Sequence, residues 1–257
     1  MEMAVSKQRR LIFLASLTVL CICGAFFIKP IPQSLAYHHF ADGREFWGIP
    51  NFANVISNLP FLLTGIIGLM LLPKAKANKA ILVTYSCLFI GILLTGFGSA
   101  YYHYSPDNNT LVYDRIPMTI VFMALLAATI GETISSKWVF VLLFPLVIIG
   151  IGSVLWWHFT ELQGHGDLRL YGLVQFYPVI FIPLILVLFP SANYTRGIKQ
   201  LVCVVIWYVI AKVFEYFDTQ IYTFNHFVSG HTLKHLAAAV STWYLVKLFN
   251  LKYASGK

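Results

Sequence analysis

Long apolar runs alternate with short polar segments along the whole chain. A run of about 20 apolar residues crosses a hydrocarbon core of roughly 30 Å as an α-helix. Runs of that kind predict eight spans, at residues 11–28, 52–72, 80–103, 113–131, 138–157, 170–189, 199–218 and 231–249. The pattern therefore predicts an all-α integral membrane protein, with a seven-transmembrane-helix bundle preceded by an extra N-terminal transmembrane helix.

The first run follows Lys7, Arg9 and Arg10, as the apolar region of a signal peptide would. The residues after it, from Phe26 to Pro30, are bulky and offer no small-residue cleavage pattern. We therefore expect an uncleaved anchor. This divides the chain into an N-terminal cytoplasmic stub with its anchor, residues 1–30, and a seven-helix domain, residues 31–257.

Composition supports the membrane assignment. The chain is 58% hydrophobic and 11% charged, whereas soluble domains carry about 25% charged residues. The net charge of +8 comes from basic residues between the apolar runs. Most of these residues lie in segments on the same side of the membrane as the N-terminus. The positive-inside rule explains this better than a nucleic-acid surface and places both termini in the cytoplasm. The short loops favour a bacterial inner membrane, with an endomembrane as the alternative.

In that topology the polar chemistry gathers near the extracytoplasmic face. Ser99 and His103 are four residues apart at the end of one helix and share a helix face. Asp114 begins the next helix, and His231 and His235 start the last one at the same spacing. Ionisable residues inside spans are costly and usually mark function.

Three imidazoles from two distant helices predict a zinc site formed by His103, His231 and His235, with one position left for water. Bound zinc lowers the pKa of that water to about 7. Asp114 would accept its proton or orient a ligand, and Ser99 would donate a hydrogen bond to a developing oxyanion. The chemistry indicated is hydrolysis of an amide or ester. The alternative is that these are interfacial polar residues that satisfy loop backbone.

Three motifs resemble the alkaline ceramidases. They are Gly98-Ser99-x-x-x-His103, Asp114-x-x-Pro117-Met118 and the late His231-x-x-x-His235, and the segment from Ile49 to Asn58 resembles the opening of the ceramidase core. The wider superfamily of seven-helix membrane hydrolases includes the adiponectin/progestin receptors and the Per1-like lipid-remodelling proteins. The resemblance covers residues 42–249, so the first span would be an addition.

The resemblance implies a zinc-dependent amidohydrolase that cleaves ceramide-like lipids to a long-chain base and a fatty acid. It implies the same roles for the three histidines, Asp114 and Ser99. It also implies Ca²⁺ as a second candidate ion, at Asp42, Glu45, Asn51 and Asn54. The sequence departs from the family there, because the loop is shorter and Asn51 stands where the family carries a glutamate.

Two alternative functions stay open. One is a lipid-remodelling esterase with the same zinc site, and the other is a receptor-like seven-helix protein with structural zinc. The expected partners are the bilayer and a membrane lipid substrate. Neither a nucleic acid nor a protein partner is predicted.

Overall fold

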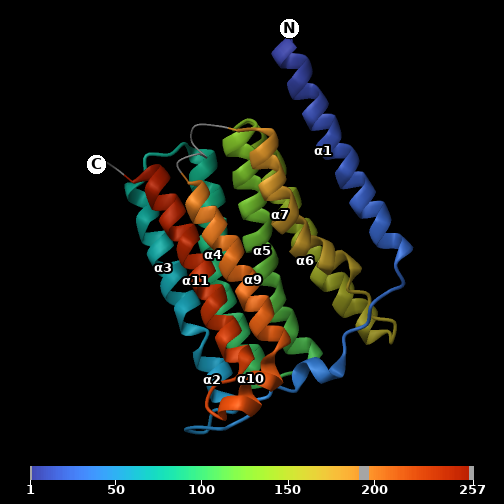
Figure 1. The fold of residues 1–257 in the computed structure, drawn as a ribbon, viewed down its shortest axis with the longest axis vertical. Helices are drawn as coiled ribbons and strands as arrows, with labels where there is room; N and C mark the ends of the chain where they lie inside the picture. The colour runs from blue at the N-terminus through green and yellow to red at the C-terminus, as the bar shows by residue number, and fades with distance from the viewer. Residues whose placement is uncertain (1, 191–196, 255–257) are drawn as a thin grey trace.

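The computed structural model describes residues 2–190 and 197–254, and within these ranges it is helical without β-strands. Figure 1 shows most helices running side by side as a bundle, with α1 apart from the rest. The helices are α1 (Glu2–Phe27), α2 (Phe52–Ile56), α3 (Leu59–Leu71), α4 (Lys79–Tyr104), α5 (Asn108–Thr133), α6 (Trp138–Leu162), α7 (Arg169–Leu188), α9 (Ile198–Tyr216), α10 (Asp218–Asn225) and α11 (Gly230–Tyr253), with 3₁₀ turns η1 (Leu35–His38) and η2 (Leu72–Lys74).

The membrane assignment is supported, but the predicted count of eight spans is not confirmed. Within the described ranges, six helical segments are long and apolar enough to cross a bilayer. A seventh arises if α9 and α10, which meet at a 71° bend, form one broken span. The predicted eighth span corresponds to α11, which lies inside the bundle beside α9 but is not among these segments (Figure 1). Its histidines, lysines and hydroxyl side chains lower the apolar character of the helix.

The bundle is held by helix pairs that are neighbours in space. The most extensive contacts join α4 to α5 and α9 to α11, followed by α5 to α6 and α3 to α4. In the core, Tyr85, Phe89 and Phe249 pack ring against ring between α4 and α11. By contrast, α1 packs against α7, where the Thr18 hydroxyl lies 2.7 Å from the Tyr177 hydroxyl.

The start of α5 is fixed by a capping box. The backbone N–H of Thr110 donates to Asp107 Oδ1 (2.6 Å), and the Asp107 N–H donates back to the Thr110 hydroxyl (3.1 Å). The bond from the Thr110 N–H, which favours the ionised form, holds the pKa of Asp107 below its usual value. The cap sets the register of α5, so Asp114 comes two turns into the helix.

A buried ion pair links α5 to α11 at the opposite end of the bundle from the three histidines. Lys252 Nζ lies 2.5 Å from Glu132 Oε2, and both side chains are 4% exposed. The hydroxyls of Tyr253 and Tyr85 donate to Glu132 Oε1 at 2.7 and 3.1 Å. One carboxylate therefore connects side chains from α4, α5 and α11.

We expect Glu132→Gln to lower the free energy of unfolding by about 3–5 kcal/mol, because it removes the charged partner of a buried ion pair. Denaturant or thermal unfolding in detergent measures the change. Lys79→Gln, which removes an exposed charge at the start of α4, is the control and should leave stability unchanged. Equal stability of Glu132→Gln and wild type would show that this pair does not hold the helices together.

Candidate metal centre and lipid cavity

The three predicted histidines meet inside the bundle. His103 ends α4, while His231 and His235 lie on the first turns of α11, and all three are buried. The Nε2 atom of His103 lies 3.1 Å from Nε2 of His235 and 3.3 Å from Nε2 of His231. One coordinating nitrogen from each residue falls within 4.8 Å of the others.

This spacing fits a small tetrahedral ion. Zinc–nitrogen bonds of about 2.0–2.1 Å at tetrahedral angles put neighbouring nitrogens about 3.3 Å apart. Neutral imidazoles cannot satisfy both contacts with hydrogen bonds, because both involve Nε2 of His103, which carries either one proton or one lone pair. The Nδ1 atom of His103 is buried and has no hydrogen-bond partner within residues 2–190 and 197–254. The donor set therefore suits a metal better than a hydrogen-bonded cluster.

Ser57 fixes the tautomer of His235. Its hydroxyl donates to the Asn54 carbonyl (3.0 Å), and the same oxygen lies 2.8 Å from His235 Nδ1. A serine hydroxyl has one proton, so the oxygen accepts from Nδ1–H. This leaves the lone pair of Nε2 facing the other histidines, which is the arrangement that partners of metal-bound histidines produce.

We expect Ser57→Ala to weaken zinc affinity about 10–100-fold, as the loss of such a partner does in other metal sites. Competition with a fluorescent zinc chelator measures this. Ser153→Ala is the matched control, because Ser153 is also a buried serine bonded to a helix carbonyl but lies on α6. Unchanged affinity in Ser57→Ala would mean that this contact does not orient a ligand.

Two further contacts hold the histidine-bearing ends in place. Asp218 accepts the backbone N–H of His231 (2.7 Å) and that of Ala41 (3.1 Å), which ties α11 to the loop after η1. From that loop, the Phe40 ring covers His103 and His231, with ring centroids 4.6 and 4.7 Å away. Sequence reasoning assigned neither Asp218 nor Phe40, since nothing local relates them to the histidines.

Ser99 and Asp114 come together through a close contact of α4 with α5. A Cβ atom on Gly98 would lie 1.9 Å from the Tyr113 carbonyl oxygen, so only glycine permits this approach. The Ser99 side chain lies beside the Asp114 carboxylate across this contact. Both side chains are buried, and both line the same cavity as His235.

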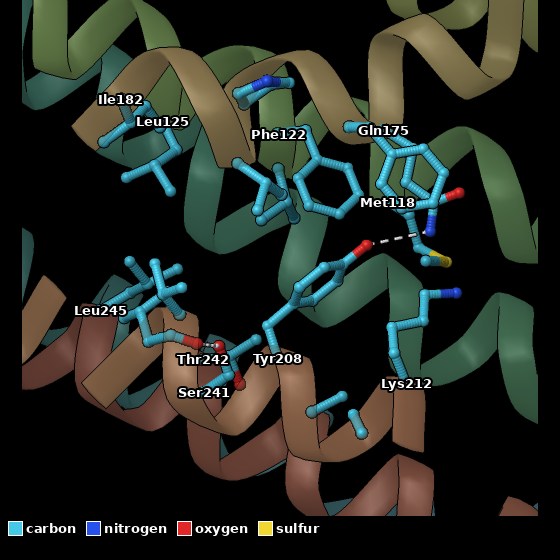
Figure 2. Close-up of a pocket in the computed structure, with 18 of the residues that line it drawn as sticks. Met118, Phe122, Leu125, Gln175, Ile182, Tyr208, Lys212, Ser241, Thr242 and Leu245 are labelled. Atoms are coloured by element: carbon cyan, nitrogen blue, oxygen red, sulfur yellow. Dashed lines mark hydrogen bonds between the residues drawn. The ribbon is translucent and has the colours of Figure 1, made fainter. Parts of the chain in front are cut away.

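That cavity is large and mainly apolar. Its volume is about 920 Å³, at the upper end of the range for small-molecule sites. Figure 2 shows Leu125, Ile182 and Leu245 at one end and Lys212 at the other. Between them, Gln175 Nε2 of α7 donates to the Tyr208 hydroxyl of α9 across the space (3.1 Å; Figure 2). One end of the cavity is therefore apolar, and the other carries charge.

Charged residues that the zinc hypothesis did not use also line this cavity. Lys212 forms an ion pair with Glu215 at 2.6 Å. Lys234 lines the cavity with His235 and bonds to Glu215 at 3.2 Å. Arg115 also lines it, and its guanidinium stacks over Trp157 (4.3 Å to the ring centroid).

Three of the four residues of the calcium hypothesis have other partners. Arg44 donates to both carboxylate oxygens of Asp42, at 2.8 Å each. Burial opposes ionisation of Asp42, but these hydrogen bonds outweigh it and hold its pKa below the usual value. Glu45 is exposed. Asn51 Nδ2 donates to the His103 carbonyl (2.9 Å), and Asn54 Oδ1 accepts from the Thr232 hydroxyl (2.8 Å).

Comparison with known proteins agrees with the motif resemblance. No curated protein matches the chain. The model of the Ceramidase family matches residues 47–255, from the loop before α2 to the end of α11. The matched range includes Ser99, His103, Asp114, His231 and His235. This match supports a membrane enzyme that hydrolyses ceramide. The chain belongs to the alkaline ceramidase family.

Proposed function

We propose that this protein is a zinc-dependent membrane amidohydrolase that cleaves the amide bond of ceramide-like lipids to a long-chain base and a fatty acid. The convergence of three buried imidazole nitrogens beside an apolar cavity carries the proposal. His103, His231 and His235 would hold the zinc. When bound, zinc lowers the pKa of a water molecule and polarises a carbonyl.

Asp114 would act as general base and acid. Its carboxylate lines the cavity near His235, where an attacking water and the substrate amide would lie. It would accept a proton from the water and return it to the leaving amine, because an amine leaves readily only when protonated. The neighbouring Ser99 side chain would orient the carboxylate before reaction.

Ser99 would donate a hydrogen bond to the carbonyl oxygen of the substrate amide. Rotation of its hydroxyl from Asp114 toward the cavity would place a donor where negative charge develops on that oxygen. The apolar wall would exclude water and strengthen these interactions. Leu125, Ile182 and Leu245 would contact the hydrocarbon chain of the lipid.

We assign residues 1–30 to a cytoplasmic stub and anchor, and residues 31–257 to the hydrolase domain. The loose packing of α1, against α7 rather than in the bundle, supports this division. Counting α11 and the bent pair α9–α10 as spans gives eight, with both termini cytoplasmic and the site near the extracytoplasmic face. Calcium binding at Asp42, Glu45, Asn51 and Asn54 stays a prediction, which calorimetric titration of the chelator-treated protein with Ca²⁺ would test.

Zinc content and lipid turnover, measured together on purified protein, test the proposed function. We expect about one zinc per chain and release of fatty acid from a fluorescent short-chain ceramide. A panel that includes a phospholipid and a glycosylphosphatidylinositol-type lipid separates an amidase from a lipid-remodelling esterase. Zinc without turnover of any lipid would favour a receptor-like protein with structural zinc. Absence of zinc would overturn the proposal.

A further inference from the structure

The polar end of the cavity carries an excess of positive charge. Its charged lining residues are three cations, Arg115, Lys212 and Lys234, and two carboxylates, Asp114 and Glu215. A bound zinc ion would add further positive charge. Because unpaired charge is costly away from water, this excess calls for a negative partner.

Glu215 cannot balance both lysines. Its Oε2 accepts from Lys212 at 2.6 Å, while its Oε1 accepts from Lys234 at 3.2 Å and from the Tyr37 hydroxyl at 3.3 Å. One negative charge is therefore shared by two ammonium groups from α9 and α11. The carboxylate also holds the two groups near each other.

The lysines keep unused hydrogen-bond donors. An ammonium group carries three donors, and each lysine uses one of them on Glu215. Across the part of the chain that the structure describes, neither ammonium has a second hydrogen-bond partner. Arg115 adds positive charge nearby, since it is 5% exposed and forms no ion pair with a described residue.

We propose that Lys212 and Lys234 form a subsite for an anionic oxygen group of a lipid, so that the cavity favours a negatively charged lipid over a neutral one of equal chain length. The negative group is either on the head group of an intact lipid amide or is the carboxylate of a released fatty acid. The inference rests on the proposed function only in taking the occupant to be a lipid.

Binding of two matched probes tests the subsite without relying on turnover. Myristate and myristyl alcohol have the same chain and differ in charge, and ligand-induced thermal stabilisation of the full chain in detergent gives both dissociation constants. We expect wild type to bind myristate about tenfold more tightly, the strength of one charge-assisted hydrogen bond.

Two variants that change the charge of the subsite in opposite directions separate this role from a structural one. Lys212→Gln should narrow the preference for myristate, because it removes one ammonium group. Glu215→Gln should widen it, because it removes the competing carboxylate while keeping its shape. Lys79→Gln removes an exposed lysine at the far end of α4 and should leave the preference unchanged. Equal binding of both probes by wild type, or shifts of the same sign in Lys212→Gln and Glu215→Gln, would overturn the subsite.

Turnover of ceramide and ceramide 1-phosphate identifies the source of the negative group. A head-group subsite predicts that wild type cleaves ceramide 1-phosphate faster than ceramide and that Lys212→Gln loses this preference. A fatty-acid subsite predicts equal turnover, with inhibition by myristate that Lys212→Gln relieves. If neither lipid is cleaved while the binding preference follows the charge variants, the proposed amidase function fails and the subsite stands.

Discussion

Substitution of His231 by alanine is expected to abolish both zinc binding and ceramide turnover. Its Nε2 atom lies 3.3 Å from that of His103, so the variant removes one of the three convergent nitrogens. Metal catalysis contributes several kcal/mol of transition-state stabilisation, and each 1.36 kcal/mol is tenfold in rate, so we expect turnover to fall by more than about a thousandfold. Elemental analysis and release of labelled fatty acid measure the two effects on the same sample.

His165→Ala is the matched control, because it removes an exposed histidine outside the cluster. It should keep zinc and activity. If His231→Ala retains a full equivalent of zinc, the three histidines do not form the metal centre. If it loses zinc and keeps turnover, the metal is structural and the catalytic role of the site is wrong.

Asp114→Asn is expected to lower turnover about 100- to 10,000-fold, the range that a positioned general acid–base contributes. An amide is nearly isosteric with the carboxylate but cannot accept a proton at neutral pH. Asp114 is not a proposed zinc ligand, since the cluster consists of three histidines, so zinc content should stay at the wild-type level. The rate at saturating substrate, measured with zinc content, separates loss of chemistry from loss of metal.

Asp107→Asn serves as the control for this change. It makes the same substitution seven residues earlier, at the cap of α5, where asparagine also caps well. It should leave turnover near the wild-type level. If Asp114→Asn is as active as Asp107→Asn, the proton is transferred by another group and the assignment of Asp114 is wrong.

The helices and the local geometry of the site could be predicted because both depend on short-range pattern. Residues four apart share a helix face, so the pairs Ser99/His103 and His231/His235 follow from spacing alone. Apolar runs likewise predicted the long helices, with most boundaries within about five residues of those observed, although α1 begins at Glu2 and the predicted first span at residue 11. The count of spans was less secure, since α11 carries the polar residues of the site and so is less apolar than a typical span.

Contacts between distant segments could not be predicted in this way. Ser57 and His235 are 178 residues apart, and their hydrogen bond depends on how α2 and α11 pack. The contact of Lys234 with Glu215 could not be predicted either. The sequence indicates only the pair of Lys212 with Glu215, which are three residues apart on α9.

The sequence by itself determined the helices, the family and the residue types of the candidate site, because periodicity and motif spacing are properties of the local chain. Only the tertiary structure decided that Nε2 of His103 lies 3.1 Å from Nε2 of His235 and that Gly98 lets Ser99 approach Asp114. It also decided that a mainly apolar cavity with charged residues in its wall lies beside them. These features depend on which helix faces pack together. Packing is set by side chains far apart in sequence, whose contacts leave no local pattern.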